Sequence, residues 1–342
     1  MHKLAYWTAR QIQNIYRYGP GYEIHFMEKK LGIIKEQPKA DWVRQQEFWQ
    51  SHHDLIQREV KAQYRMVMGR NADIGCPERF TEKIQWMKLH DRNPLRSRLA
   101  DKHAVKAWAA EKIGTEHIIP SYGAWESFDE IDFSRLPKQF VLKCSHGCGM
   151  NIVIKNKKIL NHSKNRNKIR YLLEAWMAAD YSYAGMEMHY SDIPRKIIAE
   201  KYISEIDGGL YDYKIHCFHG RPEFIQVIGE RDLSKHTAKQ KHYDFDWKDL
   251  GWTFADYPDF PKDVPRPGCL EELKQNAGIL SAGFAYVRVD FYVIENKILF
   301  GEMTFTPAGG FYPYKDRWTE QMDIRLGRMM PDLGGGIHKK QI

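Results

Sequence analysis

The sequence predicts an α+β protein in which helices come first and paired strands follow. From residue 1 to about 113, apolar side chains recur at helical spacing; Trp42, Trp49 and Ile56, for example, stand seven residues apart. Gly114 ends the last of these predicted helices. Beyond it, short apolar runs bounded by turn residues indicate strands, and several of these runs are close enough to pair as hairpins.

Length and composition indicate a globular protein with more than one lobe. The 342 residues exceed the roughly 250 to 300 that a single hydrophobic core usually holds. With 43% hydrophobic and 28% charged residues, the chain is neither disordered nor fibrous. No apolar run approaches the ~20 residues of a membrane span. The five cysteines have no framework spacing and the N-terminus lacks an apolar signal segment, so we expect a cytoplasmic protein.

The formal charge of +8 indicates an anionic partner without choosing its class. The charge alone does not distinguish between a nucleotide, a nucleic acid, an acidic glycan and a membrane. At the N-terminus, Lys3, Arg10 and Arg17 recur every seven residues beside an apolar stripe. This pattern suits either a surface helix with a solvated basic edge or a helix resting on the inner face of the membrane.

The remaining elements follow from the spacing of apolar and turn residues. A helix is predicted around residues 169–181 and another at 270–282, and residues 231–269 are expected to be irregular. Strands are predicted at residues 117–125, 140–143, 151–155, 195–203, 212–220, 221–229, 285–294 and 298–306.

The stretch KCSHGCGMN, residues 143–151, is predicted to form the tip of a hairpin. Lys143 ends one strand, and Gly147 and Gly149 would let backbone N–H groups approach an anion closely. A structural zinc site is disfavoured, because Cys144, His146 and Cys148 crowd one tip and no paired fourth ligand is evident.

The hairpin at residues 285–306 carries the most informative pair of acids. If Ile294 pairs with Ile298 across a three-residue turn, Asp290 lies directly opposite Glu302, with Arg288 on the same face. Like charges at that spacing destabilise a sheet unless a cation bridges them. Mg²⁺ would do so, since it takes one or two carboxylates plus substrate phosphates. The alternative is an exposed face on which Arg288 neutralises both acids.

Several motifs in a fixed order resemble the ATP-grasp superfamily: LADK, FVLK with the glycine loop, AEKYI, DYK, RVD and GE-x-T-x-x-P. Longer segments between about residues 75 and 315 are similar to its TupA-like branch, named for teichuronopeptide biosynthesis. The resemblance implies the ATP-grasp fold, in which two α+β lobes with antiparallel sheets grip ATP. On this basis we expect a helical region at 1–113, a small lobe at 114–199 and a large lobe at 200–342.

The same resemblance implies a role for each matching residue. Lys102 and Lys143 would contact the ATP phosphates, under a loop containing His146, Gly147 and Gly149. Arg288 would stabilise the transferred phosphoryl group, and Lys214 would face the phosphates or the acceptor. The expected adenine contacts are Glu200, Lys201 and Ile203, the ribose contact is Asp207, and the Mg²⁺ ligands are Asp290 and Glu302.

Two features depart from the family pattern. Thr304 stands where many ATP-grasp ligases have an asparagine two residues after the metal-binding glutamate, so a third protein ligand is not expected. Residues 1–113 have helical periodicity, whereas the usual N-terminal lobe alternates strands and helices. That lobe often helps to hold the acceptor, so the resemblance says least about the substrate.

The resemblance favours an ATP-dependent carboxylate–amine ligase of surface-polysaccharide biosynthesis, which would amidate a uronic acid with an amino acid through an acyl phosphate. One alternative is a glycosyltransferase with Asp244 and Asp246 as a D-x-D metal site, although turn carboxylates explain that triplet as well. Another is a non-catalytic basic protein that binds nucleic acid or membrane. A Cys–His hydrolase built on Cys217 has no ordered set of partners in the sequence.

Overall fold

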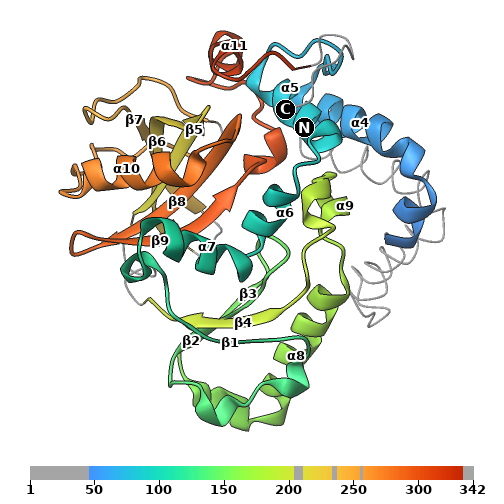
Figure 1. Cartoon of the computed structure of the whole chain (residues 1–342), viewed down its shortest axis with the longest axis vertical. Coiled ribbons are helices and arrows are strands. Elements are labelled where there is room, and N and C mark those ends of the chain that lie inside the picture. Colours follow the sequence, from blue (N-terminus) through green and yellow to red (C-terminus); the bar gives the residue numbers. More distant parts are fainter. Residues whose placement is uncertain (1–45, 204–210, 233–236, 255–256, 334–342) are drawn as a thin grey trace.

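A computed structural model describes the chain over residues 46–203, 211–232, 237–254 and 257–333. Its strands form two separate antiparallel sheets (Figure 1). The small sheet has the order β1 (Ser121–Trp125), β4 (Ile197–Lys201), β2 (Phe140–Cys144), β3 (Asn151–Ile154). The large sheet has the order β7 (Thr237–Tyr243), β6 (Arg221–Asp232), β5 (Asp212–Phe218), β8 (Tyr286–Ile294), β9 (Lys297–Thr304).

Helices surround both sheets and dominate the chain before β1. Among the described residues they include α4 (Ile56–Met68), α5 (Phe80–His90), α6 (Pro94–Ala100), α7 (Ala104–Ile113), α8 (Ser163–Ala178), α9 (Ser182–Gly185), α10 (Leu270–Ser281) and α11 (Glu320–Arg328). Single turns of 3₁₀-helix include η3 (Phe128–Glu130), η4 (Phe133–Arg135), η5 (Lys157–Asn161), η6 (Met188–Tyr190) and η8 (Pro307–Gly310). None of the described helices has the length and apolarity needed to cross a bilayer.

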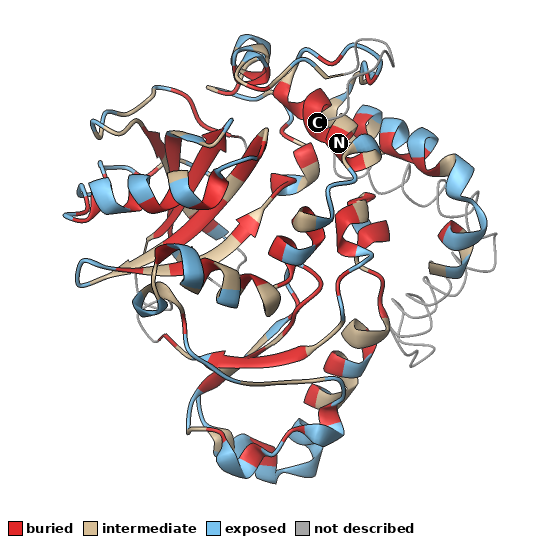
Figure 2. Ribbon diagram, in the orientation of Figure 1, coloured by how far each residue is buried: buried red, intermediate tan, exposed pale blue. Residues whose placement is uncertain are grey.

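Each sheet has its own hydrophobic core. In the small lobe, Phe140 and Leu142 of β2 pack with Ile169 and Leu173 of α8. In the large lobe, α7 and α10 contribute to a larger core with β5, β6, β8 and β9. The central strands β4 and β5 are therefore almost wholly buried, whereas α8 and α10 each expose one face (Figure 2). Alternate residues of β2 point away from α8, which places Lys143 on the opposite face of the small sheet.

The predicted α+β order is confirmed, with one strand missed. Residues 231–269 are not wholly irregular, because β7 runs through Thr237–Tyr243 and pairs with β6. The inward side chains of β7 include the polar Gln240 and His242, both fully buried, so the strand has no apolar alternation. The N-terminal residues Lys3, Arg10 and Arg17 lie outside the described residues, and the division at 113 and 199 stays a prediction.

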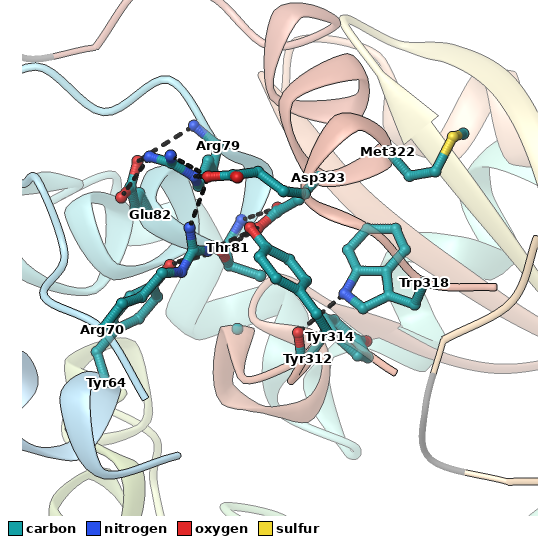
Figure 3. Close-up of polar contacts among 12 residues, drawn as sticks. Tyr64, Arg70, Arg79, Thr81, Glu82, Tyr312, Tyr314, Trp318, Met322 and Asp323 are labelled. Carbon is teal, nitrogen blue, oxygen red and sulfur yellow. Dashed lines mark hydrogen bonds and ion pairs between the residues drawn. The ribbon is translucent and has the colours of Figure 1, made fainter. Parts of the chain in front are cut away.

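The C-terminal helix is tied to the N-terminal helices by a buried carboxylate (Figure 3). Asp323 of α11 is fully buried and accepts hydrogen bonds from the Thr81 N–H (2.9 Å) and hydroxyl (2.7 Å) at the start of α5. The Thr81 N–H donates to Oδ1, and Oδ2 accepts from the Thr81 hydroxyl, from Arg70 Nη2 (3.0 Å) and from the Tyr314 hydroxyl (2.9 Å). Gly327 lets α11 approach closely, since a Cβ there would lie 1.9 Å from the Glu78 carbonyl oxygen.

Candidate active site

The acidic pair on β8 and β9 lies in the predicted register, although the hairpin turn differs from the prediction. Asp290 pairs with Glu302, and Arg288 pairs with Thr304. At the tip, however, Ile294 pairs with Lys297, so the turn has two residues, Glu295 and Asn296, both with positive φ. Beyond the turn, a β-bulge at Gly301 shifts the pairing by one residue and restores the predicted alignment.

Asp290 is buried between two cations. Arg288 donates to it through Nε and Nη2, each at 2.7 Å, and the Lys214 ammonium forms an ion pair with it from β5. Burial would raise the pKa of this carboxyl, but Arg288 and Lys214 outweigh that effect and lower the pKa to about 2. Lys214 also lies 2.8 Å from Asp212, which Arg231 contacts at 2.9 Å.

Glu302 is held more loosely and reaches solvent. Its side chain is 36% exposed, against 4% for Asp290, and Arg288 Nη2 lies 3.7 Å away. The Thr304 hydroxyl donates to it at 3.4 Å, and Lys102 lies 3.8 Å away. Arg288 thus lies between the two acids, as expected if it neutralises both of them. Glu302 nevertheless remains accessible to a ligand.

The glycine loop of the small lobe meets this layer through Lys102. The Lys102 ammonium donates to the Gly147 carbonyl at 2.6 Å while it faces Glu302. Gly147 is packed tightly, because a Cβ there would lie 2.9 Å from the Tyr181 ring. Gly149 has a φ of 73°, which favours glycine. The loop and the acidic pair, about 150 residues apart in the sequence, are therefore neighbours.

His146 points into the small lobe. Its ring is buried, and Nε2 lies 3.0 Å from the Trp176 carbonyl oxygen of α8. Burial lowers the pKa of this imidazole to about 4, so the ring is neutral near pH 7. The His146 side chain therefore supports the loop from the interior of the lobe. An anion at the loop would meet its backbone N–H groups and not this ring.

Glu200 on β4 holds two lysines. Lys143 lies 2.6 Å from one carboxylate oxygen and Lys106 of α7 lies 2.8 Å from the other. These cations lower the pKa of Glu200 although burial acts to raise it. Lys106 was not predicted as a site residue; the pattern that indicates it is its spacing of four from Lys102 at the start of a helix. Lys201 is exposed, Ile203 is buried, and Asp207 lies outside the described residues.

The pair Asp290 and Glu302 suits a hard divalent cation with few protein ligands. Among the described residues, no three His, Cys, Asp or Glu side chains are grouped to hold a metal. Mg²⁺ does not need such a group, since it commonly takes one or two carboxylates and completes its shell with water and phosphate oxygens. The exposed edge of Glu302 is compatible with that arrangement.

The side chains of the two alternative sites, the D-x-D triplet and the Cys217–His216 pair, have other roles in the fold. Asp244 Oδ1 accepts the backbone N–H groups of Asp246 (3.0 Å) and Lys248 (2.8 Å), as a turn carboxylate does. Cys217 is buried, and burial raises its pKa to about 12. The neighbouring His216 points to the other face of β5, where its Nδ1 lies 2.9 Å from the Tyr286 hydroxyl. His216 is therefore not placed to act as a general base for Cys217.

A second set of buried charges lies next to the segment that follows β9. Lys88 of α5 is 2% exposed, hydrogen-bonds Gln85 at 3.0 Å and lies 4.3 Å from the centre of the Phe311 ring. Gln85 in turn donates to the carbonyl oxygens of Gly309 (3.0 Å) and Gly310 (3.2 Å). Glu187, also buried, accepts a hydrogen bond from Thr306. These contacts hold the chain just after Glu302 in place, and no pattern in the sequence predicts them.

We expect Lys88→Met to raise the unfolding temperature at pH 7. Burial lowers the pKa of Lys88 to about 8, so the charged form is destabilised in the folded state. As the pH rises from 8 toward 10.5, the folded protein loses this proton before the unfolded chain does, which stabilises the wild type. The gain from Lys88→Met should therefore shrink across that window in thermal unfolding curves.

The exposed Lys112→Met is the matched control for this substitution and should show no such pH dependence. A lower unfolding temperature for Lys88→Met at pH 7 would mean that the contacts of Lys88 with Gln85 and Phe311 outweigh its desolvation.

Comparison with known proteins identifies one family. The family model described as TupA-like ATP-grasp matches residues 82–330, and no curated protein matches the chain. Similar solved structures include D-alanine–D-alanine ligases from Helicobacter pylori (16% identity, TM-score 0.36) and from Bacillus anthracis in complex with ATP (12%, 0.37). A D-cycloserine synthetase has 12% identity and a TM-score of 0.37.

These structural overlaps are partial. They cover 68%, 61% and 69% of this chain, in the same order. The matched part spans 61% and 55% of the two D-alanine–D-alanine ligases and 70% of the D-cycloserine synthetase.

Proposed function

The chain belongs to the TupA-like ATP-grasp family, and we propose on this premise that it is an ATP-dependent ligase that joins a carboxylate to an amine. The observation that carries the proposal is the layer formed by Lys214, Asp290, Arg288, Glu302 and Lys102. It combines cations suited to phosphates with carboxylates suited to a hard metal ion, and it joins the two lobes at one place.

The reaction must activate the acid, because a carboxylate and an amine do not condense unaided in water. A carboxylate oxygen attacks the γ-phosphorus of ATP, the bond from that phosphorus to the β–γ bridging oxygen breaks, and ADP leaves. The amine nitrogen then attacks the carbonyl carbon of the acyl phosphate and loses a proton, and inorganic phosphate leaves. Each turnover yields one amide, one ADP and one phosphate.

In this proposal the cations hold the nucleotide phosphates. Lys102 and Lys143 now contact Glu302 and Glu200, and the phosphate oxygens of ATP would replace those contacts. The backbone of the loop around Gly147 and Gly149 would cover the phosphates. Glu200, Lys201 and Ile203 lie on or just after β4, where the adenine is proposed to bind, and Asp207 remains the proposed ribose contact.

Arg288 is the proposed catalytic cation. Asp290 fixes its guanidinium through two hydrogen bonds, so it is oriented before substrate arrives. From that position it would stabilise negative charge on the transferred phosphoryl group and later on the tetrahedral oxygen. Lys214 would hold Asp290 and face the phosphates or the acceptor. Mg²⁺ held by Asp290 and Glu302 would neutralise charge on the phosphate oxygens when bound.

The substrates are proposed from the family resemblance. We infer an acid that belongs to a surface glycan, such as a uronic acid, and an amino acid as the amine. Teichuronopeptide biosynthesis, which gives the family branch its name, supports this class of substrate. The use of ATP supports a cytoplasmic reaction, and we propose that it takes place at or near the inner face of the membrane.

The decisive assay incubates the protein with ATP, Mg²⁺, a uronic acid or its oligomer, and each of a set of amino acids. We expect ADP and phosphate in equal amounts, formed only when both acid and amine are present, and a product whose mass is that of the amide. Activity that needs a nucleotide-sugar and releases its nucleoside diphosphate would instead support a glycosyltransferase and overturn the proposal.

A further inference from the structure

The basic charge of the chain is concentrated in one part of the small lobe. Residues 133–173 contain ten lysines and arginines and no aspartate or glutamate. The rest of the chain therefore holds 42 of the 52 basic residues against all 44 acidic ones, which nearly balance. The net charge of +8 is thus a property of this segment, and of its ten basic side chains the proposed nucleotide site uses only Lys143.

The fold gathers these residues at the outer end of the small lobe. The Lys157 N–H donates to the Lys138 carbonyl at 2.8 Å, which joins η5 to the start of β2. The Arg166 guanidinium of α8 lies 5.2 Å from the centre of the Phe133 ring in η4. We call the result the outer basic surface; its exposed members are Arg135, Lys138, Lys158, Lys164, Arg166 and Lys168.

This surface faces away from the proposed nucleotide site. The small sheet lies between them, with α8 on one face and Lys143 pointing from the other. In Figure 1, α8 lies at the lower end of the molecule, with the small sheet between it and the large sheet. ATP bound at Lys102 and Lys143 would therefore leave the outer basic surface uncovered.

The charges of the outer basic surface are largely uncompensated. Within the described part of the chain, no carboxylate lies within ion-pair distance of Lys138, Lys158, Lys164 or Lys168. The acids that flank the segment are Glu126, Asp129, Glu130 and Asp132 before it and Glu174 after it. Asp129 and Glu174 contact Arg170, Asp132 accepts hydrogen bonds from Ser134, and Glu130 accepts one from Ser127.

We propose that the outer basic surface docks the protein on a membrane rich in anionic phospholipid. Clusters of lysine and arginine are attracted to such headgroups. The outer basic surface carries positive charge at a density typical of such clusters. Four of the six members are lysines, whose flexible point charges suit diffuse headgroups better than bidentate recognition of one defined anion.

An apolar side chain within the surface supports a bilayer over a soluble polyanion. Ile159 of η5 directly follows Lys158 and is 36% exposed, one of four large apolar side chains so exposed among the described residues. An aliphatic group amid lysines can enter the boundary between headgroups and acyl chains, which a soluble polyanion does not offer. Docking here would leave the proposed nucleotide site uncovered.

The test is co-sedimentation of the full chain with phosphatidylcholine vesicles that contain or lack phosphatidylglycerol. We expect binding only to the anionic vesicles, and weaker binding as salt is raised. Lys158→Gln/Lys164→Gln/Lys168→Gln should weaken partitioning about 10²-fold, since each lysine contributes a factor of about five. The control Lys112→Gln/Lys262→Gln/Lys297→Gln removes the same charge from exposed positions elsewhere and should bind almost like the wild type.

A second variant separates membrane from glycan. Ile159→Ser should weaken vesicle binding severalfold and leave binding to soluble polygalacturonate unchanged. The proposal is overturned if the wild type does not bind anionic vesicles, or if the two triple variants lose binding equally. It is also overturned if polygalacturonate binds more tightly than vesicles and Ile159→Ser has no effect, which would assign the surface to an acidic glycan. The ligase assay on each variant reports separately on the proposed function.

Discussion

Glu302→Gln is expected to lower ATP-dependent product formation by roughly 10²- to 10³-fold while the fold is retained. The glutamine removes the charge that we propose for Mg²⁺ but keeps the size and hydrogen-bonding oxygen of the side chain. Its structural cost should be small, because the Glu302 carboxylate is partly exposed and its ion pairs with Arg288 and Lys102 are long, at 3.7 and 3.8 Å. The measurement is the initial rate of ADP release at saturating substrates.

Asp290→Asn provides the contrast within the same pair. It should lose activity at least as severely, but it should also lower the unfolding temperature, because Arg288 and Lys214 would keep their buried charges without their partner. A Mg²⁺-dependent thermal shift with a non-hydrolysable ATP analogue should be lost in both variants. If both variants kept that shift, the assignment of this pair to the metal would be wrong.

Asp323→Ala is expected to destabilise the protein by about 3 to 5 kcal/mol, which is the usual cost of removing one partner from a buried charged network. The carboxylate is fully buried and joins Thr81, Arg70 and Tyr314, so its loss leaves several donors without an acceptor (Figure 3). It also removes a negative charge from the N-terminus of α5. Chemical denaturation with urea, followed by circular dichroism, measures the effect.

Glu320→Gln is the matched control on the same helix. Glu320 pairs with Arg79, with Nε to Oε1 at 3.0 Å, but its side chain is 50% exposed. Solvent screens an exposed pair of this kind, so Glu320→Gln should shift the urea unfolding curve far less than Asp323→Ala does. Equal losses from Asp323→Ala and Glu320→Gln would show that burial is not what makes this junction strong.

The sequence was informative wherever one face of an element is apolar. The alternation in residues 285–306 predicted both strands and the pairing of Asp290 with Glu302, because a buried face fixes the phase of a strand. β7 was missed for the corresponding reason. Its buried face carries Gln240 and His242, and Gln240 is satisfied there by Gln226 and the Phe254 carbonyl. A polar network of this kind leaves no hydrophobic period to detect.

The candidate site was predictable only as far as its motifs extend. Lys102, Lys143, Arg288 and the acidic pair were named from spacing and resemblance. Their partners were not, because contacts such as that of Lys106 with Glu200 join residues far apart in the chain. The same holds for the buried direction of His146, which depends on where α8 packs against the small sheet.

The bulge at Gly301 lets Asp290 and Glu302 pair although the two-residue turn sets a different register at the hairpin tip. Asp290 is already fixed by its pairing with Lys214 in the middle of the sheet, so only β9 can be misaligned. One extra residue in β9 absorbs the difference between a two-residue turn and the pairing that the acids require, and a Cβ at Gly301 would lie 3.1 Å from the Asp290 carbonyl oxygen. If β9 paired without the bulge, the register of the tip would place Gly301 opposite Asp290 and Glu302 opposite Val289, on the other face of the sheet. The alignment of the two acids therefore depends on a bulge at a residue that contributes no side chain to the proposed metal site.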